Sequence, residues 1–600
     1  MKLSTRTLEA KSMTPTATRK LTIIAQDPMV KDRDGTILTT QVSIPAEELA
    51  GGPWGYRVQV IDYDASSRTL YKAAPPLKDG KDPFLDASDE KLLGDPGFHS
   101  QNVYAIVMRI LSRFEFALGR RVAWGFKPHQ LKVAPHAFAD ANAFYSREHE
   151  ALLFGYFPGR GGGTIFSCLS HDVVAHETTH ALVDGLRACF LDPSSVDQAA
   201  FHEGVSDVVA LLSVFAIDDV VRALLDRHAG RLAVTVQPEF VDVRKLTVKN
   251  LRESVLLGLG EEMGDELNAV RGRPLRQSAL IEPDPRHYRE DPEFQEPHRR
   301  GEILVAAMMN AFLEVWAWRL STLGDGQSQR LHRERVAEEG GRAADYLLTM
   351  TIRGLDYCPP VHLEFGDFLS AILTADAEIR PDDTAFRFRD ALRESFLAYG
   401  IVPASDKNPK TGEAGLWATA SARSEGALSY SRTRFESLTR DPDEVFRFLW
   451  ENRGPLKLAE GVFTHVNSVR PCIRVGPEDG FLLRETVAEY EQQIELRAGE
   501  LGDFPDPRDP ERRGVRKPLG MPDDTKVILQ GGGTLIFDEY GRLKFHVNNR
   551  LDDVEKQSTR LQHLWDFGEF SNGKSLRRRF SAMHRLRAMD RSCPTPEAWI

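Results

Sequence analysis

Cysteine is scarce in this sequence and shows no pattern. The 600 residues include five cysteines, an odd number, and no two of them form a CxxC pair. They lie at Cys168, Cys189, Cys358, Cys472 and Cys593. This usage excludes the disulfide framework of a small secreted protein, so we expect reduced structural thiols.

Signals for export and for membrane insertion are also missing. The first twenty residues, MKLSTRTLEAKSMTPTATRK, are basic and polar and lack the apolar core of a secretory signal peptide. We find no apolar run that approaches the length of a transmembrane helix. We therefore expect a cytoplasmic protein without a membrane partner, while export by a route that the N-terminus does not encode stays open.

An excess of positive charge is absent as well. The formal net charge is −11, which argues against a general nucleic-acid binder. Hydrophobic residues make up 41% of the chain, as in folded globular proteins, and the length favours more than one domain.

The stretch HDVVAHETTHALVDG, residues 171–185, carries the strongest chemical signal. In a helix, residues four apart share a face, so His176 and His180 can direct their imidazoles to one zinc ion. Glu177 would reach the edge of that site, where a carboxylate can act as a general base. The alternative is a core helix in which the histidines fall at this spacing by chance.

A catalytic zinc usually takes three protein ligands. The stretch FHEGVSDVVALL, residues 201–212, also has a helical pattern and places Glu203 four residues before Asp207. Glu203 can supply the third ligand, and Asp207 can accept the outward N–H of a ligating histidine.

Together these motifs resemble the gluzincin metallopeptidases, and specifically the thermolysin-like neutral proteases, whose pattern is HExxH followed by E-x-x-S-D. The similarity covers roughly residues 20–405 and includes the closing helix FRDALRESFLAYGIVP. It implies zinc ligands at His176, His180 and Glu203. It also implies that Asn142 and Ala143, in a segment similar to the family's N-A-F-W/Y, bind the substrate backbone.

The resemblance implies further catalytic groups with less exact matches. His298, with Glu293 five residues before it, takes the place of the family's oxyanion-stabilising histidine and its carboxylate, although H-R-R-G is one residue shorter than H-x-N-S-G. Arg276 is the expected substrate-binding arginine, with Arg273 as the alternative. The family's oxyanion tyrosine has no clear match here.

The calcium site of the family is incompletely matched. Asp172 corresponds to one acidic calcium ligand, but Val214 occupies the place of another. Asp218 and Asp219 lie nearby, yet two acids after a helix are more often a solvated turn. We predict one zinc ion and no bound calcium.

The expected fold is α+β, with a two-lobed catalytic unit similar to thermolysin and an α+β accessory module. Residues 1–165 would form a β-rich lobe, 166–405 the zinc-binding and helical lobe, and 406–600 the module. Strands are expected in the first 70 residues, a helix at 101–118, and a hairpin at 527–549 with its turn at Asp538 to Gly541. SDKNPKTGEAG, residues 405–415, would be the linker, and we expect residues 1–405 to fold alone.

These observations predict a zinc-dependent metalloendopeptidase that hydrolyses peptides or unfolded proteins. The alternative is a non-proteolytic scaffold with a structural zinc site, acting through a C-terminal module that binds an unidentified protein partner. Retention of Glu177 favours the enzyme, since a structural zinc has no use for a general base.

Overall fold

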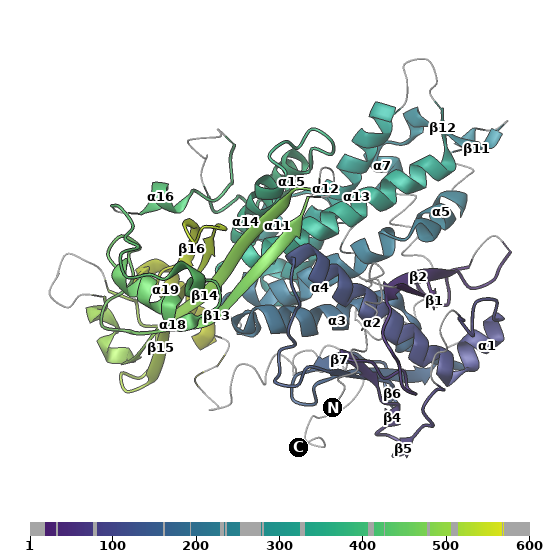
Figure 1. The fold of residues 1–600 in the computed structure, drawn as a ribbon, viewed down its shortest axis with the longest axis horizontal. Coiled ribbons are helices and arrows are strands. Elements are labelled where there is room, and N and C mark those ends of the chain that lie inside the picture. Colours follow the sequence, from purple (N-terminus) through teal and green to yellow (C-terminus); the bar gives the residue numbers. More distant parts are fainter. Residues whose placement is uncertain are drawn as a thin grey trace, which may run out of the picture.

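The protein combines helices and strands, with two separate β regions and a helical region between them (Figure 1). The computed structural model describes residues 18–31, 34–75, 81–159, 162–192, 194–227, 233–234, 237–252, 278, 281–323, 330–405, 413–424, 426–476, 480–505, 514–566, 568 and 570. A fold of mixed α and β structure, as expected from the sequence, is confirmed in these residues. Most of the expected linker at 405–415 lies outside them.

Most strands of the N-terminal region belong to two sheets. Strands β1 (Thr18–Ile24) and β2 (Thr39–Pro45) pair antiparallel, and a larger mixed sheet has the order β3-β6-β8-β7, with β9 also paired to β8. The strands of the larger sheet are β3 (Val58–Val60), β6 (Leu131–Phe138), β7 (Ala143–Ser146), β8 (Ala151–Pro158) and β9 (Thr164–Phe166). A short hairpin joins β4 (Tyr63–Asp64) and β5 (Thr69–Leu70). Within the described residues β7 pairs only with β8, so its other edge faces away from the sheet.

Helices form the centre of the molecule. The long ones are α2 (Pro96–Leu118), α3 (His171–Leu186), α4 (Val196–Phe215), α12 (Pro297–Leu323), α13 (Arg333–Gly354) and α14 (Phe365–Ile379). Shorter helices are α1 (Asp89–Gly94), α5 (Asp218–Arg227), α7 (Val248–Leu251), α11 (Pro285–Arg289) and α15 (Phe388–Ala398). A small sheet of β10 (Ala233–Val234), β11 (Gln237–Asp242) and β12 (Arg330–His332) lies at the edge of this region. Large apolar side chains of α2, α4, α12 and α13 pack into one continuous core.

Two glycines bring α4 and α12 close together. A side chain at Gly204 would place its Cβ 3.1 Å from the carbonyl oxygen of Gly301, and one at Gly301 would meet the carbonyl oxygen of Ala200 at the same distance. Absence of Cβ atoms at both positions therefore permits the close contact of the two helices. Since Gly204 follows Glu203 directly, the N-terminal part of α12 around Gly301 lies near the residue expected as the third metal ligand.

The C-terminal region is a four-stranded antiparallel meander. Its strands are β13 (Phe463–Val475), β14 (Leu482–Arg497), β15 (Lys526–Phe537) and β16 (Leu543–Asn549), in that order. The expected hairpin is confirmed: β15 pairs with β16, and Gly541 N donates to the carbonyl oxygen of Asp538 at the turn. This region also contains four helices: α16 (Ala420–Arg423), α17 (Phe435–Leu438), α18 (Pro442–Glu451) and α19 (Val554–Asp566).

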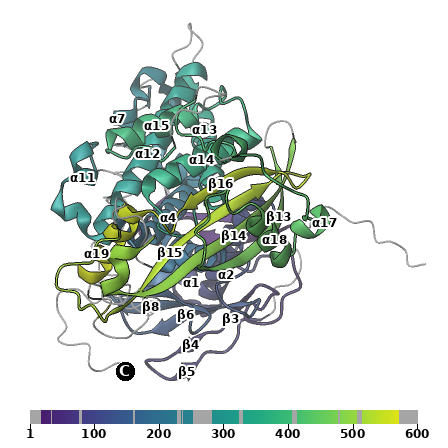
Figure 2. The same ribbon diagram turned by 90° about the vertical axis from the view of Figure 1, so that its left-hand side faces the viewer.

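Both faces of the β15 strand are buried. Leu535 and Phe537 pack with Phe448 of α18, whereas Ile536, which points the other way, joins the core of the helical region with Phe545. Figures 1 and 2 show the sheet against one side of the helices. The segment expected as an accessory module thus shares a hydrophobic core with the rest of the protein.

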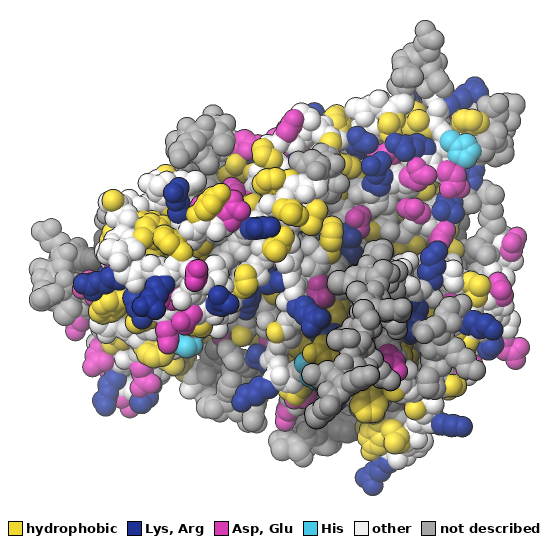
Figure 3. All heavy atoms as spheres, viewed as in Figure 1, with side chains coloured by type: hydrophobic (Ala, Val, Ile, Leu, Met, Phe, Trp, Pro, Cys, Tyr) yellow, Lys and Arg dark blue, Asp and Glu magenta, His cyan; other side chains and the backbone are white. Residues whose placement is uncertain are grey.

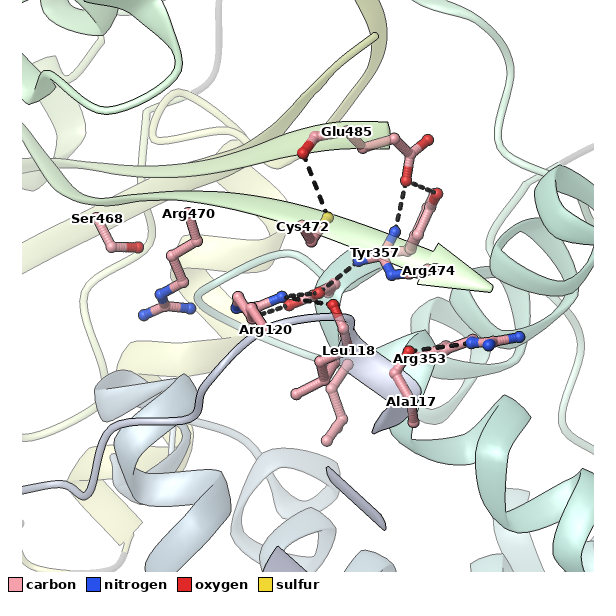
Figure 4. Close-up of polar contacts among 12 residues, drawn as sticks. Ala117, Leu118, Arg120, Arg353, Tyr357, Ser468, Arg470, Cys472, Arg474 and Glu485 are labelled. Atoms are coloured by element: carbon pink, nitrogen blue, oxygen red, sulfur yellow. Dashed lines mark hydrogen bonds and ion pairs between the residues drawn. The ribbon is translucent and has the colours of Figure 1, made fainter. Parts of the chain in front are cut away.

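Buried charges also join the two regions (Figure 4). Asp356, beyond α13, forms ion pairs with Arg120 and with Arg474 of β13, the latter at 2.6 Å. Arg474 also pairs with Glu485 of β14, which accepts a hydrogen bond from the hydroxyl of Tyr357 at 2.7 Å. These carboxylates are almost fully buried. Buried charges of this kind depend on their partners, so the two regions are energetically coupled.

Helix α12 is more apolar than expected from the sequence. Residues Arg299–Leu323 of α12 are long and apolar enough to cross a membrane, although the sequence analysis found no such run. In the structure 72% of the most apolar window is buried inside the protein, as in the core helix of a soluble domain. On the face shown in Figure 3, basic and acidic side chains are interspersed.

Candidate metal centre

Helix α3 is buried along almost its whole length although its sequence is partly polar. Buried polar groups require hydrogen-bond partners. The hydroxyls of Thr178 and Thr179 donate to the carbonyl oxygens of Val174 and Ala175, one turn back in the same helix, at 2.6 and 2.8 Å. The threonines of HETTH are thereby satisfied within the helix, and the two histidines and the glutamate must find partners outside it.

His176, His180 and Glu203 converge on one point between α3 and α4. The Nε2 atoms of the two histidines lie 2.9 Å apart, and each lies 3.6 Å from a carboxylate oxygen of Glu203. A metal–ligand distance of about 2.0–2.1 Å and tetrahedral angles would place ligand atoms about 3.3 Å apart. The observed separations fall on both sides of that value, so these three residues fit a metal ion.

The outer nitrogens of both histidines have partners on α4. Nδ1 of His176 lies 2.6 Å from a carboxylate oxygen of Asp207, which can only accept. Nδ1 of His180 lies 2.9 Å from Nδ1 of His202 and 3.3 Å from the hydroxyl of Ser206. When His176 and His180 carry their N–H on Nδ1, the lone pair of Nε2 in each of these two rings is directed to the candidate metal centre.

Sequence reasoning missed His202 and Ser206. Both lie on α4 with the spacing of one helical turn, and a polar pair at this spacing in an apolar helix is a usable signal. Their contacts with His180 depend on how α3 packs against α4, and the spacing of residues within α4 does not determine that packing.

Glu177 directly follows the first of these histidines on α3, and the edge strand β7 holds its carboxylate. Its Oε2 atom accepts a hydrogen bond from the backbone N–H of Tyr145 at 3.0 Å. The side chain is 2% exposed, so the carboxylate is held in a largely dry environment. Helix α3 thus directs two histidines to the centre and one carboxylate to the neighbouring strand.

The open edge of β7 has the polarity that an extended peptide needs. Backbone groups of alternate residues in an antiparallel strand point to the same side. The carbonyl oxygen of Asn142 accepts from Gly155 N on the β8 side, whereas Tyr145 N points toward Glu177. By this alternation the N–H and C=O of Ala143 also face the outer edge, the edge at which Glu177 is bound.

The remaining expected residues are placed less fully. The backbone of His298 belongs to the first turn of α12, but its side chain lies outside the part that the structure describes, as do Arg276 and Arg273. Glu293 is about half exposed and forms an ion pair with Arg299 at 2.9 Å. A contact between Glu293 and His298 therefore stays a prediction.

The acidic residues considered for calcium have other contacts. Asp172, buried near the start of α3, accepts hydrogen bonds from the hydroxyl of Ser170 and from the backbone N–H of Val173. Asp219, the second residue of α5, accepts a hydrogen bond from the hydroxyl of Thr40 and forms an ion pair with Arg222. The absence of calcium stays a prediction.

Burial shifts the pKa values of two further groups near α3. Burial and the neighbouring Arg109 lower the pKa of His171 to about 3, so this first residue of α3 is neutral at physiological pH. Burial and Asp184 raise the pKa of Tyr145 well above its ordinary value, and its hydroxyl donates to Asp184 at 2.8 Å. Tyr145 therefore anchors β7 to α3 as a neutral phenol.

The fold and the site define a protein of mixed α and β structure with a buried three-residue group able to hold a metal ion. No protein-family model matches the chain, and no curated protein matches it. The geometry of this group and of its surroundings is therefore the basis for proposing a function.

Proposed function

We propose that this protein is a zinc-dependent metalloendopeptidase with a catalytic arrangement similar to that of thermolysin. The observation that carries the proposal is the position of Glu177. Its carboxylate is adjacent in sequence to the ligand His176 and is hydrogen-bonded to the strand whose free edge can hold a peptide. Ligands, base and peptide-binding edge are then parts of one site.

The ligand set favours zinc and a catalytic site. Imidazole nitrogens and a carboxylate oxygen suit zinc, and structural zinc sites are usually closed by four protein ligands. Among the described residues, this centre has three candidate protein ligands. When bound, a zinc ion would polarise the scissile carbonyl and increase the acidity of a water molecule in the site.

Residues of the chain supply the rest of the reaction. A peptide would add to the outer edge of β7, with Ala143 offering its backbone N–H and C=O and with Asn142 beside it. Glu177 takes a proton from the attacking water as the water oxygen bonds to the carbonyl carbon. It later gives that proton to the amine nitrogen as the C–N bond breaks.

Further groups would stabilise the charge that develops on the carbonyl oxygen. His298 belongs to the α12 turn that the Gly204–Gly301 contact holds beside Glu203, which supports its role as an oxyanion donor. Arg276 remains the proposed substrate-binding arginine, and Glu293 the proposed partner of His298. The two-lobed architecture similar to thermolysin is part of the same proposal.

The scaffold alternative places function in residues 406–600 and needs only a structural metal. The position of Glu177 favours the enzyme. Its carboxylate is buried and bound to the edge strand β7, so it is not needed as a fourth metal ligand and can act as a base. Peptides or unfolded proteins are the proposed substrates, because the edge of β7 can pair only with an extended chain.

Removal and return of the metal test the proposal. The full-length protein should cleave a dye-labelled unfolded protein, lose that activity with 1,10-phenanthroline, and regain it when zinc is added after dialysis. The Glu203→Gln variant, treated in the same way, should stay inactive after zinc is added, because it lacks the third zinc ligand. Cleavage that persists in the metal-free protein would refute the metallopeptidase function.

A further inference from the structure

A second group of metal-binding side chains lies outside the site described above. It comprises His99 of α2, His136 of β6 and Cys168, in the 3₁₀ turn Ser167–Leu169 just before α3. Nδ1 of His99 is 2.7 Å from Nε2 of His136, and the donor atoms of all three residues lie within 4.8 Å of one another. The three residues are 1%, 4% and 0% exposed.

The outer nitrogens of the two histidines are bound to groups that only accept hydrogen bonds. Nδ1 of His136 is 2.9 Å from a carboxylate oxygen of Asp62, and Nε2 of His99 is 3.0 Å from the carbonyl oxygen of Leu93. Each neutral ring therefore carries its N–H on the outer nitrogen. The inner nitrogens then face each other across 2.7 Å with lone pairs and no hydrogen between them.

Counting hydrogens shows what this arrangement lacks. Three contacts, two outer and one inner, need three hydrogens, and two neutral imidazoles supply two. The third position must be filled by an additional proton or by a metal cation. The thiol of Cys168, at the same point and fully buried, adds a third donor atom that a shared proton would not need.

We propose that His99, His136 and Cys168 form a second metal site, which binds a zinc ion through two imidazole nitrogens and one thiolate. Thiolate and imidazole are ligands that zinc accepts. Asp62 would be the outer carboxylate that orients His136, as is common for metal-bound histidine. One divalent cation balances the charges of the thiolate and of Asp62.

Surrounding residues hold the site and connect it to a cavity. The ring of Phe166 packs against both imidazoles, with centroids 4.7 Å from His99 and 5.1 Å from His136. Both histidines line a cavity of about 750 Å³ that is also bordered by Tyr71 and Tyr156. Three protein ligands beside a cavity leave a fourth position for water or a small ligand.

The inference does not depend on the proposed peptidase function. Its test uses cobalt in place of zinc, because thiolate-bound Co²⁺ has a charge-transfer absorption in the near ultraviolet that nitrogen and oxygen ligands do not give. The site of His176, His180 and Glu203 contains no sulfur, so the band reports on thiolate ligation, which only the second group supplies. The full-length protein should bind two equivalents of Co²⁺ and show this band.

Variants separate the two sites. Cys168→Ser should lose the absorption band and one equivalent of bound Co²⁺. Glu203→Gln should lose one equivalent of Co²⁺ and keep the band. Cys189→Ser, which changes a buried cysteine that follows α3 in the chain, should keep the band and both equivalents. Zinc K-edge absorption of the unmodified protein should show about one sulfur per two zinc ions, which needs no variant to fold. One equivalent of metal without the band, or zinc without sulfur ligation, would overturn the proposal.

Discussion

The guanidinium of Arg187 forms an ion pair with Glu489 at 3.0 Å. Arg187 directly follows the last residue of α3 and is almost completely buried, while Glu489 lies on the C-terminal strand β14. Arg187 also donates to the carbonyl oxygen of Leu355 and to the hydroxyl of Thr534. The helix that carries HETTH is therefore held at its end by the C-terminal sheet.

This contact changes what we expect of a truncated chain. Residues 1–405 alone would leave Arg187 without Glu489 and would expose the apolar surface that Ile536 and Phe545 cover. We now predict that the 1–405 fragment is insoluble or unfolds well below the full-length protein, contrary to the expectation from sequence. Thermal unfolding of both proteins, purified in parallel, measures this. A fragment with the full-length melting temperature and metal content would show that the two regions are independent.

Asp356 gives a sharper test of the same coupling. Asp356→Asn should lower the free energy of unfolding at pH 7 by about 3–5 kcal/mol, because Arg120 and Arg474 lose the charge that compensates them. Denaturant unfolding measures the change, and Asp523→Asn, at an exposed carboxylate, should stay within about 0.5 kcal/mol of the unmodified protein. Equal losses in both variants would mean that the buried network contributes nothing specific.

The pH dependence of that difference has a definite sign. Burial alone would raise the pKa of Asp356, but the arginines, Arg120 first, hold it well below its ordinary value. A lowered pKa in the folded state gives stability that is present above the unfolded pKa, about 3.9, and is lost as the pH falls below it. The difference in free energy of unfolding between the unmodified protein and Asp356→Asn should therefore be constant from pH 5 to 7. It should become smaller below about pH 4.

Asp207 should affect metal affinity without being a ligand. Asp207→Asn keeps the shape but removes the charge that orients His176, so we expect zinc affinity to fall about 10- to 100-fold. Competition with a chromophoric chelator measures the affinity, and Asp390→Asn, on the surface of α15, serves as the matched control. Unchanged affinity in Asp207→Asn would remove the carboxylate from the metal centre.

How much of this could be predicted from sequence depends on the distance between the partners. Within the pairs His176/His180 and Glu203/Asp207 the common face was predictable, because each pair shares one helix with 3.6-residue periodicity. That the two pairs meet was expected from the resemblance to the HExxH and E-x-x-S-D pattern, not from periodicity. The contact of His202 with His180 requires two helices in register, and the group of His99, His136 and Cys168 joins a helix, a strand and a turn. No spacing rule covers such sets.

The C-terminal contacts were missed for a related reason. The hairpin at 527–549 follows from local alternation and its turn, and it was predicted. That Ile536 packs on the helical region while Leu535 packs on α18 depends on which face of the sheet is covered, and alternation alone cannot say this. A polar stretch near residue 405 therefore looked like a domain boundary, although the strands beyond it complete the core.

The most direct test of the proposed mechanism is the initial rate of peptide cleavage by Glu177→Gln, measured beside its zinc content. Glutamine has nearly the shape of glutamate but cannot accept the proton, and general-base assistance is worth about 10² to 10⁴ in rate. For Glu177→Gln we predict full zinc occupancy, an unchanged fold and a cleavage rate reduced by about 10⁴ or more. His298→Ala should keep part of the activity. Glu338→Gln, a control at an exposed carboxylate, should keep all of it. Zinc-loaded Glu177→Gln that cleaves at close to the unmodified rate would contradict the metallopeptidase mechanism.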